Sequence, residues 1–113
     1  GKIVAKHIGA AMRFYVRSCD LNHTKACVVL GDFLRKNNHL PASREAYKLA
    51  CFREDRIGCY KLGLLFEEGS GFSYNPKGAR AAYKIACDEG YSKACHRLRK
   101  ITTLLNSEKV RSY

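Results

Sequence analysis

Hydrophobic residues recur along this chain with the spacing of amphipathic helices. An apolar stripe with the spacing i, i+3, i+4 occurs twice, first as Leu30, Phe33 and Leu34 and again as Leu62, Leu65 and Phe66. Near the start of the chain, Met12, Tyr15 and Val16 share one helical face and are expected in the core. No segment alternates as a half-buried strand would. The pattern predicts an all-α protein of about six helices, over residues 3–19, 24–34, 41–51, 57–67, 76–87 and 92–104.

Helix-breaking residues separate these helices. Pro41 and the pair Asn75-Pro76 suit helix starts, where proline needs no amide partner and an asparagine side chain caps the first turn. Gly69 suits a helix end. The predicted hairpins span about residues 3–34, 41–67 and 76–104, within a single domain of residues 1–105. Residues 106–113 carry no periodicity and are expected to form a loose tail.

A five-position pattern repeats along the chain. Tyr-x3-Cys-x7-Cys-x2-Leu occurs three times and uses all six cysteines. Its tyrosines are Tyr15, Tyr47 and Tyr83. Cys19 and Cys51 are 32 residues apart, and Cys51 and Cys87 are 36 apart. A period of this size, with one helical hairpin per unit, is typical of α/α solenoids, in which neighbouring hairpins cover each other's apolar faces.

The six cysteines fall in three pairs across the predicted turns. Antiparallel helices joined by a short turn bring such positions within the roughly 5–6 Å Cα separation of a disulfide. The repeat therefore favours the pairs Cys19–Cys27, Cys51–Cys59 and Cys87–Cys95. Two alternatives stay open. One is a zinc or redox site, although the tight Cys-x-x-Cys pairs of such sites are missing, and the other is reduced cysteines that fill small core positions.

The formal net charge of +11 is distributed unevenly. Residues 1–40 carry 7 basic and 2 acidic side chains, residues 41–70 carry 5 of each, and residues 71–113 carry 9 and 3. On the last predicted helix, a basic stripe is formed by Lys93, Arg97, Arg99 and Lys100. We expect it to dock an acidic protein, a larger complex or an anionic membrane surface, with a plain solvent-exposed face as the alternative. Nucleic-acid binding is disfavoured, because the repeat tyrosines occupy core positions and are not interleaved with the stripe.

The sequence offers few other candidates for catalytic or metal-binding residues. The four histidines stand in unrelated contexts, and Glu67-Glu68 fits a solvated helix end. No set of nucleophile, base and orienting group is evident. The chain has no run approaching the roughly 18 apolar residues of a membrane span. We therefore expect no enzymatic activity, no metal and no cofactor.

The residues around the cysteines resemble a known repeat. The segments Ala46-Tyr-Lys-Leu-Ala-Cys51, Gly58-Cys-Tyr-Lys-Leu-Gly-Leu-Leu-Phe-Glu-Glu-Gly-Ser-Gly71 and 79–95 are similar to Sel-1-like repeats, which are relatives of the tetratricopeptide repeat. They resemble the cysteine-rich branch, with one disulfide per hairpin. The resemblance covers about residues 10–104 and implies a right-handed α/α solenoid that acts as a non-enzymatic protein-interaction scaffold. It departs at Arg99, which stands where Gly31 and Gly63 stand in the other copies and fits a last, capping helix.

Two groups of that branch set different functional expectations. The first group is represented by the mitochondrial assembly factor of cytochrome c oxidase. A resemblance of the chain to this group implies an intermembrane-space scaffold or an accessory subunit of a respiratory-chain complex. Residues 1–11 lack a clear signal-peptide pattern, and paired cysteines suit import by oxidative trapping. The second group is the bacterial cysteine-rich Hcp family. A resemblance of the chain to this family implies, as the alternative, a secreted or periplasmic protein that binds host or cell-wall partners.

Overall fold

Six helices make up the part of the chain that the structure describes. The computed structural model gives the backbone of residues 2–69 and 74–111 and the side chains of residues 9–69 and 74–107. The helices are α1 (Lys2–Asp20), α2 (Thr24–Lys36), α3 (Leu40–Phe52), α4 (Arg56–Glu68), α5 (Pro76–Asp88) and α6 (Ser92–Arg111). The predicted all-α fold class is confirmed.

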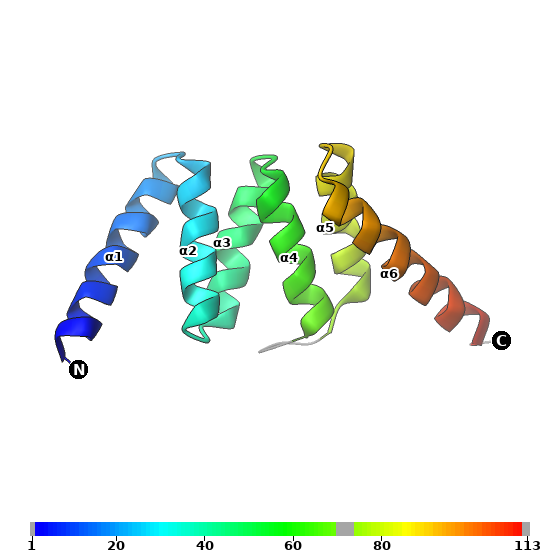
Figure 1. The fold of residues 1–113 in the computed structure, drawn as a ribbon, viewed down its shortest axis with the longest axis horizontal. Helices are drawn as coiled ribbons and strands as arrows, with labels where there is room; N and C mark the ends of the chain where they lie inside the picture. The colour runs from blue at the N-terminus through cyan, green and yellow to red at the C-terminus, as the bar shows by residue number, and fades with distance from the viewer. Residues whose placement is uncertain (1, 70–73, 112–113) are drawn as a thin grey trace.

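The helices are stacked in chain order (Figure 1). Each helix packs against the next one, so α1–α2, α3–α4 and α5–α6 form three successive hairpins. The molecule is elongated, with extents of 56 × 28 × 18 Å, and its two ends lie far apart. This is the architecture of an α/α solenoid, in which each hairpin contacts only its neighbours.

The three hairpin turns share one backbone conformation. The third residue after the first cysteine of each pair has a positive φ, which is 71° at Asn22, 64° at Glu54 and 89° at Gly90. At each turn the amide of this residue donates to the carbonyl of that cysteine, at 2.9–3.1 Å. Such a left-handed residue satisfies carbonyl groups at a helix end and reverses the chain. The two cysteines of each copy consequently face each other across the turn.

The ends of α4 and α5 follow the predicted chemistry. The Asn75 side chain accepts a hydrogen bond from the Gly78 amide at 2.9 Å, just ahead of Pro76 at the start of α5. Gly69 ends α4 in the left-handed conformation, with φ of 66°. Both boundaries therefore come from local residues rather than from distant packing.

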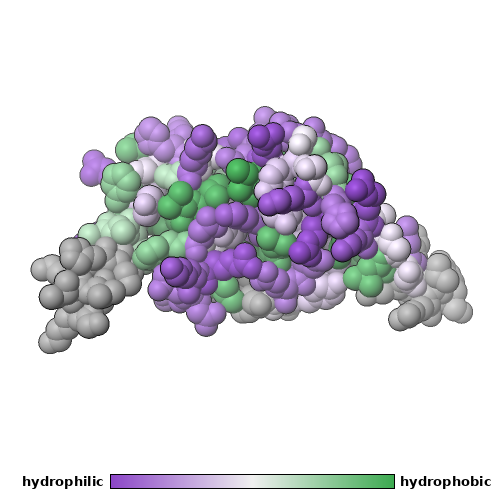
Figure 2. Space-filling view, in the orientation of Figure 1, coloured by the Kyte–Doolittle hydropathy of each residue, from purple (hydrophilic) through white to green (hydrophobic). Residues whose placement is uncertain are grey.

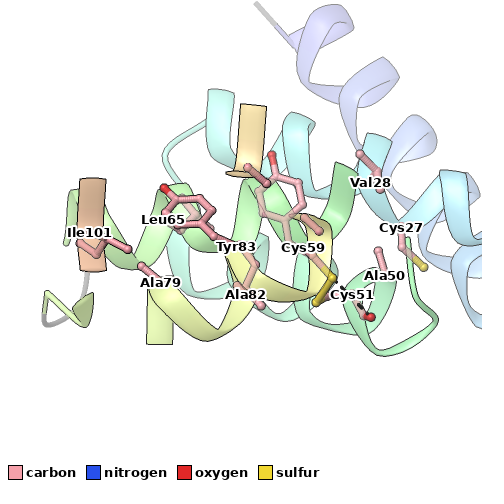
Figure 3. Packing of buried hydrophobic residues seen from close by; sticks show 14 of the residues in the cluster. Cys27, Val28, Ala50, Cys51, Cys59, Leu65, Ala79, Ala82, Tyr83 and Ile101 are labelled. Atoms are coloured by element: carbon pink, nitrogen blue, oxygen red, sulfur yellow. Dashed lines mark hydrogen bonds between the residues drawn. A yellow bond between two sulfur atoms is a disulfide. The ribbon is translucent and has the colours of Figure 1, made fainter. Parts of the chain in front are cut away.

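Buried tyrosines and glycines join neighbouring hairpins. A Cβ atom at Gly31 would lie 2.4 Å from Cε1 of Tyr47, and one at Gly63 would lie 2.5 Å from Cε1 of Tyr83. Both tyrosines are fully buried, so only a glycine leaves room for each ring. Figure 3 shows the run of buried side chains that continues from α2 to α6.

Two expectations about α1 and α6 are wrong. The predicted loose tail over residues 106–113 is helical through Arg111, and residues 112–113 lie outside the described residues. No Gly or Pro follows Ser92 to stop this helix, and Leu, Glu, Lys and Arg are good helix formers. Val16, expected in the core, is 43% exposed. Lys48 and Lys84 hold the same place in the other copies, so the repeat itself marks this position as solvent-facing.

Candidate functional site

Each hairpin is closed by one disulfide across its turn. The Cα–Cα distances are 4.7 Å for Cys19–Cys27, 4.4 Å for Cys51–Cys59 and 4.7 Å for Cys87–Cys95. These are the three pairs that the repeat favours, and all six cysteines are bonded. The cysteines therefore act as staples between the last turn of one helix and the first turn of the next. They are neither metal ligands nor free thiols.

The three staples differ in their burial. The first two disulfides are buried, whereas Cys87–Cys95 is half-buried at the C-terminal hairpin. Arg53, in the turn after α3, covers the first staple. Its guanidinium donates to the Cys19 carbonyl at 2.7 Å and lies 3.3 Å from Sγ of Cys27. Arg53 thus links the second hairpin to the closed end of the first.

A network of one tyrosine, one acid and one base ties successive helices together. The Tyr47 hydroxyl donates to Oδ1 of Asp32 at 2.5 Å, and Nζ of Lys61 lies 2.7 Å from the same carboxylate. These residues belong to α3, α2 and α4, so one network joins three helices. Burial raises the pKa of Tyr47, and the hydrogen bond to Asp32 raises it further. The hydroxyl therefore keeps its proton and remains a donor.

The same network recurs one hairpin further along. The Tyr83 hydroxyl donates to Oε2 of Glu67 at 2.5 Å, and Nη1 of Arg97 lies 3.3 Å from that oxygen. Burial raises the pKa of Tyr83, and Glu67 adds to the shift. Burial by itself lowers the pKa of Arg97, but the negative charge of Glu67 together with the neighbouring Tyr83 and Tyr60 outweighs burial, and the pKa is raised. Arg97 follows Cys95 by two residues, as Lys61 follows Cys59.

The structure divides the basic stripe predicted on α6. Arg97 turns to Glu67 and becomes part of the tyrosine network. Lys93, Arg99 and Lys100 are exposed, and none of them forms an ion pair with a residue that the structure describes. A shallow hollow of about 350 Å³ on α6 is lined by His96, Arg99, Lys100 and Thr103. The sequence predicts one stripe of four basic residues, whereas in the structure three of them stay exposed and Arg97 is paired with Glu67.

A second hollow, which is not evident from the sequence, lies between α3 and α5 and is called the α3–α5 groove below. Its volume is about 490 Å³, and its apolar lining includes Phe52, Leu62, Phe66, Ala81, Ala82 and Ile85. Two charged contacts lie along it, with Nζ of Lys48 5.7 Å from the centre of the Phe52 ring and an Arg44–Glu45 ion pair at 3.4 Å. The available signal was Phe52, which is 72% exposed and stands where the other copies carry Asp20 and Asp88.

The face formed by α2, α4 and α6 is different in character. Figure 2 shows it as largely hydrophilic over α4 and α6, with hydrophobic residues gathered toward α1 and α2. In the same orientation, α3 and α5 lie behind α4 and α6 (Figure 1). The α3–α5 groove therefore belongs to the helices at the back of this view.

The described residues contain neither a cluster of metal-ligating side chains nor a membrane-spanning helix. Nowhere in that part of the chain do three His, Cys, Asp or Glu side chains come together as they would around a metal ion. Among the described helices, none is both long and apolar enough to cross a membrane.

Fold, repeat and staples together define a class: helical-repeat proteins built from disulfide-closed hairpins. No family model matches the chain, and no curated protein matches it significantly. Among solved structures, it is similar to the cysteine-rich protein B (HcpB) of Helicobacter pylori. The TM-score is 0.70, and the sequences are 31% identical over 77% of this chain and 68% of that chain.

At this identity and coverage, the chain belongs to the family of cysteine-rich Sel-1-like repeat proteins that includes the Helicobacter pylori protein. The resemblance inferred from the repeat segments is confirmed, and so is the solenoid with one disulfide per hairpin. The match is to a bacterial protein and lends no support to a mitochondrial role.

Proposed function

We propose that this chain is a non-enzymatic binding module that holds a segment of a partner protein in the groove between α3 and α5. The groove is the observation that supports this function best. Its volume of about 490 Å³ falls within the range of about 300–1,000 Å³ that is common for ligand sites. A space of this size accommodates a few side chains of an extended or helical segment.

An apolar lining determines what the groove can hold. Leu62 is buried in its floor, while Ile85 and Phe52 expose 42% and 72% of their surfaces. Apolar surface left in water is stabilised by contact with an apolar partner. We therefore expect the bound segment to present a large apolar side chain, such as Leu or Phe, to the groove.

The charged residues of the groove favour acidic neighbours for that side chain. Lys48 is exposed, and Arg44 lies beside Glu45, so this side of the groove carries two basic groups and one acid. The excess of positive charge agrees with the formal net charge of +11. A segment whose apolar residues are flanked by carboxylates complements this arrangement.

The three disulfides support an oxidising compartment, because such bonds persist in secreted and periplasmic proteins and are rare in the cytosol. The similarity to a Helicobacter pylori protein favours a secreted or periplasmic bacterial protein. We propose this in place of the mitochondrial assembly factor or respiratory-chain accessory subunit that was the first expectation.

A peptide titration tests the groove. The probe is a fluorescent peptide that carries Leu-Phe between two Glu residues in a Gly-Ser frame. Ala81→Arg places a long side chain in the groove, whereas Ala42→Arg makes the same change at an exposed alanine of α3 that does not line it. We expect A81R to weaken binding at least about tenfold and A42R to change it less than about twofold.

Two results of this titration contradict the proposal. One is an equal effect of A81R and A42R, which means that the peptide binds elsewhere. The other is equal binding of a control peptide in which Ser replaces Leu and Phe, which means that the apolar lining plays no part.

A further inference from the structure

The outer face of α6 differs from the matching faces of α2 and α4. In those helices, Gly31 and Gly63 leave room for the tyrosine ring of the next hairpin. The matching place in α6 holds Arg99, which is exposed. At the two inner positions even a Cβ atom would collide with the tyrosine ring. The larger side chain of Arg99 therefore leaves no room for the tyrosine of another hairpin packed on α6 in the same way.

The charge of this face is reversed as well. Asp32 follows Gly31 directly, Glu67 follows Gly63 by four residues, and these acids accept the tyrosine hydroxyls. In α6 the residues at those two distances from Arg99 are Lys100 and Thr103. At these positions α2 and α4 thus carry a glycine and an acid, whereas α6 carries two large basic side chains.

The cations of this face have no acidic partner in the described part of the chain. No Asp or Glu occurs between Ser92 and Ser107 of α6. Glu67 of α4 is already bound by Tyr83 and Arg97. The Thr103 hydroxyl donates to the Arg99 carbonyl at 3.0 Å, which leaves the Arg99 guanidinium, the Lys100 ammonium and the His96 imidazole as the donors that face the hollow.

We propose that this face binds an acidic segment of a partner protein through Asp or Glu carboxylates. The residues concerned are His96, Arg99, Lys100 and Thr103, with Lys93 beside them. An arginine binds a carboxylate with two parallel hydrogen bonds, and a neighbouring lysine adds a second charge. The lining contains no large apolar side chain of the kind that inserts a surface helix into a bilayer, so a protein is favoured over a membrane. The face is separate from the α3–α5 groove and does not depend on it.

Binding of a fluorescent hexaglutamate peptide, measured by anisotropy at low ionic strength, tests this site. The variant Arg99→Glu with Lys100→Glu reverses both cations. The matched control, Lys25→Glu with Lys36→Glu, makes the same change of net charge at exposed positions of α2. We expect the α6 variant to lose at least about tenfold in affinity and the control less than about threefold, and we expect added salt to weaken binding by the unmodified chain.

Equal losses in the two variants would show that only net charge matters, and would overturn the proposal. Binding of the unmodified chain to vesicles with about 30% phosphatidylserine, without binding to hexaglutamate, overturns it in favour of a membrane. Where charge reversal disturbs the circular dichroism spectrum, Arg99→Gln with Lys100→Gln replaces it. Hexaglutamate should bind the A81R variant normally, so failure of the groove and failure of this face can be told apart.

Discussion

Gly31 and Gly63 are the residues at which one hairpin meets the tyrosine of the next. Their role is steric, because the ring of Tyr47 or Tyr83 occupies the space that a side chain would take. The tyrosine hydroxyls then hold an acid from the helix before, which in turn binds a base from the helix after. The glycine and the tyrosine network together thus fix the distance and the register between neighbouring hairpins.

Gly63→Ala should destabilise the fold. The new Cβ atom would lie 2.5 Å from the ring of Tyr83, which is fully buried, so the ring or the helix has to shift. We expect the free energy of unfolding to fall by about 1–3 kcal/mol in urea titrations. Gly9→Ala in α1 is the control, because a Cβ atom there meets nothing within 4 Å. It should stabilise the chain by about 0.5–1 kcal/mol through helix propensity. Equal effects of the two substitutions would contradict the steric role.

Tyr83→Phe should remove a dependence of stability on alkaline pH. The pKa of Tyr83 is raised above its ordinary value near 10, so its protonated form is favoured in the folded state. Its contribution is fully present below about pH 10 and is lost as the pH rises toward the folded-state pKa. We expect Y83F to cost about 1–2 kcal/mol near neutral pH and to flatten the loss of stability above about pH 10. Tyr74→Phe, at a residue 48% exposed, is the control. Parallel pH profiles for Y83F and the unmodified chain would count against the network.

At the scale of single elements, the hairpins are set by their turns and staples. Each turn places a left-handed residue three positions after a cysteine, and each disulfide closes the resulting corner. Loops this small are stabilised by about 2–3 kcal/mol per disulfide, if the bond is unstrained. A short hairpin gains a large share of its stability from such a contribution, since an isolated pair of helices of this length buries little surface.

Mild reduction should open the staples in a defined order. Cys87–Cys95 is half-buried, whereas the other two disulfides are buried and Arg53 covers the first of them. Under limiting reductant, followed by rapid alkylation and mass spectrometry, we expect label first at Cys87 and Cys95. Label appearing first at Cys51 and Cys59 would mean that exposure does not control reduction of this protein.

Much of the element structure follows from sequence because its causes are local. Asn75, Pro76 and Gly69 mark helix ends by their own chemistry, and the cysteine spacing specifies which helices are neighbours. The α3–α5 groove could not be found in this way, because it depends on side chains of hairpins that meet only after folding. The position of Arg97 is similar, since its partner Glu67 lies 30 residues away on α4.

At the scale of the whole molecule, the inner and outer faces of the solenoid carry different residues. Phe14 is 65% exposed at the N-terminal hairpin and stands where Ala46 and Ala82 are buried in the other copies. Arg99 likewise replaces the glycines of the inner faces at the C-terminal hairpin. Large residues at these two faces suit contact with water or a partner rather than with another hairpin of the same kind. The sequence repeat reveals these positions once the three copies are aligned.

The most direct measurement is a disulfide map of the native protein by mass spectrometry. The protein is alkylated without reductant and digested at acidic pH, which prevents disulfide exchange. We predict no alkylated cysteine and three linked peptide pairs, joining Cys19 to Cys27, Cys51 to Cys59 and Cys87 to Cys95. Six alkylated cysteines, or links between different hairpins, would contradict the stapled solenoid and the oxidising compartment that it implies.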